Sequence, residues 1–445
     1  MKRKAAGVLS MASTRIPEFD LMRGIALFGI FLMNIIAMAY PYEAYLNPLA
    51  FDANNWLLTV EQRTNLAWRL DDTIFSVLYI FVHQKMLSMF ACLFGVSALM
   101  ILESQQAKRL RYYFARNIWL IVFGCLHLLF LFYGDILFVY GLCALVLWVF
   151  AWLPARILLA LSLSLFLGSL YLLFDYQQII NGYSAQQLLE LQQIWILPAE
   201  WVVGTVQRMK EPIDSFPLAY YICLECLGEE PIVVSQYFSI FTYVTFMHTF
   251  SMMLLGMGLY KLGFLPSLTS QGLVKTQQYN NKLYRLIACW GGIVGVVLMV
   301  AGLALNYAEH WSVEFSIVKG YLFSHIATPI MLMAYLSCLI LWQQSESSLR
   351  LKKAIQAVGR MALSNYILQS CIGLFVFTGL GFGYFGGLGR LQLLLIALLV
   401  CAALTGFSVL WMKCFYHGPL ESLWRSLSKC QWIKMRKSIP SDLSR

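Results

Sequence analysis

Charged side chains are scarce in this chain of 445 residues. Asp, Glu, Lys and Arg make up 12% of the sequence, whereas a soluble globular domain carries roughly 25%. No polar stretch between the apolar runs is long enough to form a separate soluble catalytic domain. The composition therefore indicates a membrane protein, and any chemistry must take place among its apolar segments and their loops.

Familiar catalytic signatures are also missing. The sequence has no Walker A motif, no H-E-x-x-H and no G-x-S-x-G. The match to G-x-G-x-x-G at residues 381–386 lies between two apolar runs rather than in a strand-to-helix unit, so it does not indicate a dinucleotide site. Cys223 and Cys226 form a C-x-x-C pair without a second pair or a nearby histidine, which favours a short disulfide or two free thiols over a metal site.

What the chain does have is long apolar runs, which predict an all-α, polytopic transmembrane helix bundle because about 20 apolar residues cross a bilayer. The run 117–155 would be about 58 Å long as one helix, so it must fold back at the Tyr133–Asp135 turn. The predicted spans are residues 21–40, 74–102, 113–133, 136–154, 156–175, 236–260, 284–306, 315–342, 357–380 and 391–414.

The distribution of basic residues predicts the orientation. Most of the 32 lysines and arginines fall in segments on the same side as the N-terminus, whereas the segment 176–235 is acidic. The positive-inside rule then places both termini in the cytoplasm. The same distribution argues against nucleic acid as a partner, because the basic residues occur in short clusters between spans. Membrane lipids are the expected surroundings, and the sequence leaves a homodimer open.

Four regions follow from this reading. Residues 1–175 form an N-terminal five-span half, and 176–235 form an outer amphipathic segment with one or two surface helices. Residues 236–430 form a C-terminal five-span half, and 431–445 form a basic cytoplasmic tail. The first span serves as the targeting signal, because no cleavable signal peptide precedes it.

His127 and Asp135 are the histidine and the aspartate of the apolar run 117–155, which contains no other charged residue. A carboxylate that holds one nitrogen of an imidazole leaves the other nitrogen competent as a general base. The alternative for each is a packing role.

Further polar residues within the predicted spans are candidates for the functional site, because burying a polar group in a membrane costs free energy. Asn34 can stabilise an oxyanion or bond a neighbouring helix. His83 and Lys85 lie in the second span, where a lysine must reach water, a carboxylate or an anionic ligand. His248 and His325 lie near the middle of their spans, and each is interpreted as a hydrogen-bonded structural histidine.

The inner ends of the spans carry candidates for binding a donor. Asp20 and Arg23 are three residues apart on a helix and can pair, so that Arg23 either anchors the helix or holds an anionic ligand. Arg360 joins these donor-binding candidates. Asn365 and Gln369 are spaced i, i+4 and are predicted to line one cavity.

Several motifs together resemble the YeiB-like membrane proteins, the family of domain of unknown function 418. They lie in the family's order between residues 15 and 427: "RIPEFDLMRGIALFGIFLMNI", "KMLSMFACLFGVSALMI", "RNIWLIVFGCLHLLFLFYGDILFVYGLCAL", "VGRMALSNYILQS", "TGLGFGYFGG" and "CFYHGPLESLWR". The segment 176–235 matches least.

The resemblance implies a bundle of ten or eleven spans in the bacterial inner membrane and distant kinship with transmembrane acyltransferases. Those enzymes move an acyl group from a cytoplasmic thioester to an acceptor at or across the membrane. Asn34 looks equivalent to an asparagine of the lysosomal heparan acetyltransferase. That enzyme's loop histidine has no counterpart in residues 35–73, so His127 or His83 must replace it.

The sequence therefore predicts an acyltransferase that uses acetyl-CoA or another acyl-CoA, no metal, and a small-molecule or glycan acceptor with a hydroxyl or amine. The alternatives are a transporter for a small solute or lipid, with intramembrane His, Lys and Asp sites, and a structural membrane protein without turnover.

Overall fold

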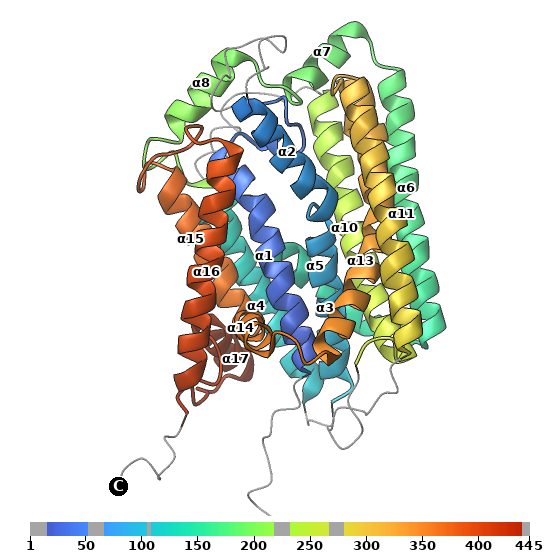
Figure 1. Cartoon of the computed structure of the whole chain (residues 1–445), viewed down its shortest axis with the longest axis vertical. Coiled ribbons are helices and arrows are strands. Elements are labelled where there is room, and N and C mark those ends of the chain that lie inside the picture. The colour runs from blue at the N-terminus through green and yellow to red at the C-terminus, as the bar shows by residue number, and fades with distance from the viewer. Residues whose placement is uncertain (1–15, 52–65, 105–107, 218–231, 267–279, 438–445) are drawn as a thin grey trace, which may run out of the picture.

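The computed structural model describes residues 16–51, 66–104, 108–217, 232–266 and 280–437, and in these ranges the protein is a bundle of long helices (Figure 1). The described residues form no sheet, only one isolated bridge between Phe415 and Arg436. The helices are α1 (Pro17–Ala39), α2 (Leu66–Phe81), α3 (Lys85–Leu102), α4 (Arg109–Phe130), α5 (Leu137–Leu147), α6 (Ala155–Asn181), α7 (Ala185–Gln193), α8 (Ala199–Arg208), α10 (Ile232–Leu262), α11 (Asn281–Ala308), α12 (Val313–Phe315), α13 (Tyr321–Gln344), α14 (Leu349–Arg360), α15 (Ala362–Phe377), α16 (Arg390–Cys414) and α17 (Pro419–Lys429).

The bundle is that of a multi-pass membrane protein. Eight helical segments of the described chain are long and apolar enough to cross a bilayer, and the bent pair α14–α15 makes a ninth. The one predicted span that remains, 136–154, is the short helix α5 with the single turn Trp148–Phe150 after it. The prediction of an all-α membrane bundle is confirmed.

Two ends of the bundle can be told apart in Figure 1. The short helices α7 and α8 cover one end, and α14 and α17 lie at the other, which we call the α7/α8 end and the α14/α17 end. The predicted surface helices of segment 176–235 are therefore present as α7 and α8, up to Pro217, where the description stops. Cys223 and Cys226 lie outside the described residues.

Two predicted spans are not continuous helices. The span 74–102 is interrupted between α2 and α3, where Gln84 has a φ of 59°. The span 357–380 is too short at its start: α14 begins at Leu349, and α15 turns away from it by 82°. Hydropathy does not reveal such breaks, because both sides of each break remain apolar.

Glycines allow helices of the site to approach closely. A Cβ on Gly124 of α4 would lie 2.3 Å from the backbone nitrogen of Phe138 on α5, and a Cβ on Gly359 of α14 would lie 1.8 Å from the carbonyl oxygen of Asp20 on α1. Only glycine fits at either contact, as is common where membrane helices pack backbone to backbone. These contacts fix α5 against α4 and α14 against α1.

Candidate functional site

The central polar feature is a chain of contacts from Asp135 through His127 to a serine. The Nδ1 atom of His127 lies 2.8 Å from Oδ1 of Asp135, and both side chains are fully buried. The Nε2 atom of His127 lies 2.8 Å from the hydroxyl of Ser370 on α15. The Nδ1 contact is close without being a linear hydrogen bond. This arrangement of carboxylate, imidazole and hydroxyl is that of a nucleophilic triad.

Local backbone structure places the two ionisable groups. His127 lies in the last turn of α4, where its carbonyl oxygen accepts from the N–H groups of Leu131 and Phe132, both at 2.9 Å. The Oδ2 atom of Asp135 accepts from the N–H of Phe138 at 2.6 Å, so this carboxylate caps α5 and keeps Oδ1 for His127. The side chain of Asp135 is therefore buried, although the residues of the turn at Tyr133–Asp135 are partly exposed.

Ser370 is the residue that sequence reasoning missed. Its helix also carries Tyr366, whose ring centroid lies 4.8 Å from that of His127 and whose buried hydroxyl has no acceptor for its proton among the described residues. The amide nitrogen of Gln369 is buried and has no hydrogen-bond partner in the same part of the chain. The run "NYILQS" carried a signal, because polar residues at i, i+3 and i+4 share a helix face.

A carboxylate distinguishes His127 from the other buried histidines. Each of three further histidines contacts a serine, but no carboxylate of the described chain lies within ion-pair distance of their rings. These pairs are His83 with Ser324 at 3.3 Å, His248 with Ser88 at 2.8 Å, and His325 with Ser169 at 2.8 Å. Of these four histidines, His127 alone lies within ion-pair distance of a carboxylate of the described chain.

Lys85 begins α3 directly after the break and is completely buried. Its ammonium donates to the carbonyl oxygen of Tyr79 and to the sulfur of Met299, each at 3.1 Å. The expected water, carboxylate or anionic ligand is therefore replaced by a carbonyl that the break sets free. Within the described residues, Lys85 makes no hydrogen bond or ion pair with His127 or Asp135.

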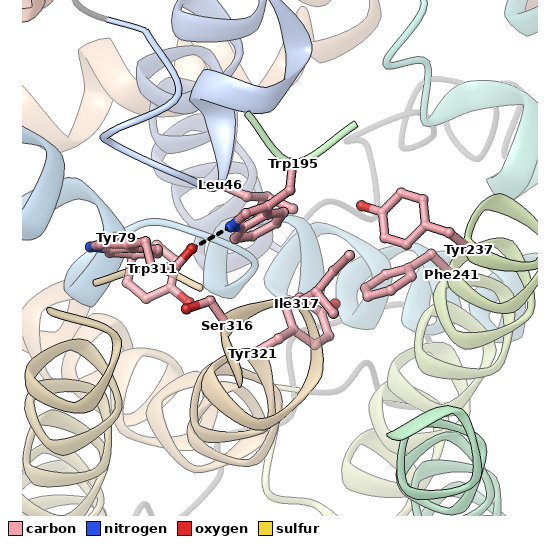
Figure 2. A pocket seen from close by; sticks show the side chains of 9 residues that line it. All are labelled: Leu46, Tyr79, Trp195, Tyr237, Phe241, Trp311, Ser316, Ile317 and Tyr321. Carbon is pink, nitrogen blue, oxygen red and sulfur yellow. Dashed lines mark hydrogen bonds between the residues drawn. The ribbon is translucent and has the colours of Figure 1, made fainter. Parts of the chain in front are cut away.

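Gln84 lies between two narrow cavities. Its amide nitrogen donates to the hydroxyl of Tyr321, which lines an aromatic pocket at the α7/α8 end (Figure 2). Trp195 closes that pocket by donating from Nε1 to the carbonyl oxygen of Trp311 at 2.7 Å. Gln84 also lines the second cavity, together with Asn34.

The second cavity adjoins the surroundings of His127. Leu87 lines it, and the carbonyl oxygen of Leu87 accepts from the hydroxyl of Tyr140 at 2.8 Å. Tyr140 belongs to the same buried cluster as Tyr366, which packs on His127. The second cavity therefore contacts this core through Leu87, and His127 contacts it through the ring of Tyr366.

The donor-binding candidates lie at the α14/α17 end. Nη1 of Arg23 lies 3.2 Å from Oδ1 of Asp20, and its Nη2 donates to Ser97 at 2.6 Å. Arg360 is electrostatically coupled to Asp20 and donates to the carbonyl oxygen of Tyr416 at 3.3 Å.

Asn365 makes its hydrogen bonds to residues other than Gln369, and the cavity predicted for both stays a prediction. Its amide nitrogen donates to the carbonyl oxygen of Val358 at 3.2 Å and to Ser408 of α16 at 2.9 Å. The carbonyl oxygen of Val358 also accepts from the N–H of Met361 at 3.0 Å, so Asn365 adds a second hydrogen bond at the bend.

Glu421 of α17 caps the bend from the other side. Its Oε1 accepts from the N–H groups of Leu363 and Ser364 at 2.7 and 3.1 Å, and its Oε2 accepts from the hydroxyl of Ser364 at 2.5 Å. Burial raises the pKa of Glu421, and these hydrogen bonds oppose the shift.

Comparisons with known proteins agree with the sequence resemblance. Residues 268–431 match the family model described as "Protein of unknown function (DUF418)". The chain is 26% identical to the uncharacterized protein YxaH of Bacillus subtilis, over 96% of this chain and 98% of the relative. It is 28% identical to the uncharacterized protein YeiB of Escherichia coli, over 92% and 95%. No solved structure matches.

Proposed function

Since residues 268–431 match the DUF418 family model, the chain is similar to YeiB, and Asp135, His127 and Ser370 lie in contact within its membrane part, we propose that it is an integral inner-membrane acyltransferase. It transfers an acyl group, preferentially acetyl, from a CoA-type thioester to a hydroxyl or amine acceptor at or across the membrane. The donor approaches from the cytoplasm, the side of the membrane on which the positive-inside rule places both termini. The contact chain from carboxylate to serine is the observation that carries this proposal.

In the first half-reaction Ser370 is the nucleophile. Its oxygen attacks the thioester carbonyl while Nε2 of His127 takes the hydroxyl proton, and Asp135 stabilises the imidazolium. The tetrahedral intermediate then expels the thiolate, which receives the proton from His127. The products are the free thiol and an ester on Ser370.

In the second half-reaction the acceptor takes the place of the thiol. His127 removes the proton of the acceptor hydroxyl or amine, whose oxygen or nitrogen attacks the ester on Ser370. The intermediate releases the serine oxygen, which regains its proton from His127. Exclusion of bulk water from the buried triad favours transfer over hydrolysis.

Developing negative charge needs hydrogen-bond donors. Tyr366 and Gln369 supply a buried hydroxyl proton and a buried amide nitrogen that nothing else in the described chain accepts. Their place on the helix of Ser370 makes them better candidates for the oxyanion than Lys85, whose ammonium points to Tyr79 and Met299. Asn34 lines the second cavity, together with Gln84 and Leu87.

Acylation of Ser370 is the direct test. The purified full chain is incubated with acetyl-CoA, quenched in acid and analysed by intact and peptide mass spectrometry. The expected result is one acetyl group on Ser370, absent from Ser370→Ala and His127→Ala. Asp135→Asn is expected to slow acylation by about 10⁴-fold, because a triad without its carboxylate holds the wrong tautomer.

The chain provides a matched control for these variants. His325 and Ser169 form an equally buried pair at the same 2.8 Å distance but lack a carboxylate, so His325→Asn and Ser169→Ala should acylate normally. An enzyme that folds normally, binds the thioester and never acquires the label on Ser370 would refute the covalent mechanism. Equal loss in the His325 and His127 variants would refute the assignment of the base.

A transporter is the second candidate, favoured by the broken span at Gln84 with the buried Lys85 beside it. Discontinuous helices line substrate sites in many transporters. The test is solute-dependent proton flux in liposomes that contain the protein. Flux that Lys85→Met abolishes and His127→Ala leaves intact would favour transport over acyl transfer.

A further inference from the structure

Three arginines converge at the α14/α17 end. Arg425 of α17 is close enough to both Arg23 of α1 and Arg116 of α4 to repel them electrostatically. The guanidinium of Arg116 lies 4.2 Å from the ring centroid of Trp424, whose Nε1 donates to the carbonyl oxygen of Arg116 at 2.7 Å. All three arginine side chains are partly buried. We call Arg23, Arg116 and Arg425 the arginine cluster.

The cluster lacks enough negative charge of its own. Asp20 pairs with Arg23 and is also coupled to Arg360. Glu421 precedes Arg425 by one turn of α17, but its carboxylate is turned to the start of α15. Arg425 has no hydrogen bond or ion pair with any described residue. Gathering partly desolvated like charges is unfavourable, so the arrangement calls for an anion.

The type of side chain indicates the type of anion. Arginine presents a planar fork of donors that matches the oxygens of phosphate in a bidentate manner. The cluster brings together three such forks from three helices, which is more positive charge than one carboxylate can balance. The cluster is therefore suited to a phosphate or diphosphate group.

Two helices connect this cluster to the candidate site. His127 follows Arg116 by eleven positions on α4, and Asn34 follows Arg23 by eleven positions on α1. Eleven residues make about three turns, so the members of each pair share a helix face at a separation of roughly 16 Å. A ligand with its phosphate at the cluster would reach His127 with an arm of that length.

The geometry points to a binding site for the phosphate end of a two-part ligand, formed by Arg23, Arg116 and Arg425. The arm of this ligand extends toward His127. A pantetheine arm has thirteen bonds from phosphorus to sulfur and spans roughly 15 Å at the extension per bond of a polypeptide. An anionic phospholipid offers the same phosphate on an acyl arm. The phosphate site stands without the proposed acyl transfer, whereas the match of the arm to His127 depends on it.

Binding of inorganic pyrophosphate tests the site. Isothermal titration calorimetry of the full chain in a neutral detergent should show binding that weakens with added salt. Arg425→Ala should weaken it roughly tenfold to a hundredfold, the range for hydrogen bonds to a charged group. Arg425→Lys, which keeps the charge without the fork, should lie between. Arg285→Ala at the exposed start of α11 is the matched control and should bind like the wild type.

Two lipid environments distinguish the sources of the phosphate. In nanodiscs of phosphatidylglycerol, pyrophosphate affinity falls if a lipid headgroup occupies the cluster; in phosphatidylcholine with a soluble thioester as competitor, it falls if the ligand is soluble. Absence of pyrophosphate binding by a folded protein, or equal affinity in Arg425→Ala and the control, would overturn the inference. His127→Ala should still bind pyrophosphate, so failure of acyl transfer leaves the site testable.

Discussion

Gly124→Ala tests whether the contact between α4 and α5 holds the catalytic geometry. The added Cβ would lie 2.3 Å from the nitrogen and 2.6 Å from the Cα of Phe138, which are backbone atoms that cannot rotate away. Ordinary van der Waals contact requires a separation of α4 and α5 by about 1 Å more. Because Asp135 caps α5, the same displacement draws its carboxylate away from His127.

The size of the effect follows from the geometry. The contact between Nδ1 and Oδ1 would lengthen from 2.8 Å toward about 4 Å, the limit of an ion pair, and the carboxylate would stabilise the imidazolium less. Overpacking of this kind costs about 1–3 kcal/mol of unfolding free energy. We expect the loss of Ser370 acylation to approach that of Asp135→Asn, although the substituted residue has no reactive group.

The measurement pairs unfolding with acylation. Unfolding free energies in mixed micelles are compared for Gly124→Ala and Gly292→Ala, since a Cβ at Gly292 meets nothing within 4 Å. The control should gain up to about 1 kcal/mol, because alanine favours the helix. If Gly124→Ala matched the control in stability and kept wild-type acylation, the close approach of the two helices would not matter to the site.

Three further predictions concern stability. Burial raises the pKa of Glu43 from 4.5 to about 7, so its contribution is complete below about pH 4.5 and is lost as pH rises through 7; Glu43→Gln should remove this fall of at most about 3 kcal/mol in unfolding free energy. Lys85→Met should be as stable as the wild type or more so in detergent unfolding, because a buried ammonium with only a carbonyl and a thioether is poorly compensated. Glu421→Ala should lower the unfolding free energy by about 1–2 kcal/mol, because it removes the cap of α15. In Glu421→Gln the amide oxygen can still accept from the N–H of Leu363, so a loss as large as that of Glu421→Ala would contradict the capping role.

Much of the architecture was accessible from the sequence, because apolar runs of bilayer length leave few alternatives. The turn at Tyr133–Asp135 follows from the length of one run, whereas the contact between His127 and Asp135 depends on how α4 ends. The breaks after Phe81 and Arg360 cannot be predicted in this way, because they depend on the rest of the structure. At the second break, Asn365 donates to a backbone carbonyl and Glu421 accepts from a backbone N–H.

Ser370 shows the limit for the site itself. A serine in an apolar helix is common and can bond its own backbone, so the polar face of "NYILQS" does not by itself identify Ser370 as a nucleophile. Its role emerges only when α15 is placed against α4, which the sequence separates by more than 200 positions. Conversely, Lys85 looked costly in the sequence, and the break that provides its carbonyl partner was not visible there.

The cap that Glu421 places on α15 has a consequence for the order of assembly during synthesis. The residues that Glu421 binds, Leu363 and Ser364, leave the ribosome well before α17 does. Until α17 arrives, the first turn of α15 has unsatisfied N–H groups at the edge of the bilayer, where they are expensive. The half-span that carries Ser370 can therefore settle only after nearly the whole chain has been made, so the candidate nucleophile is among the last groups to be placed.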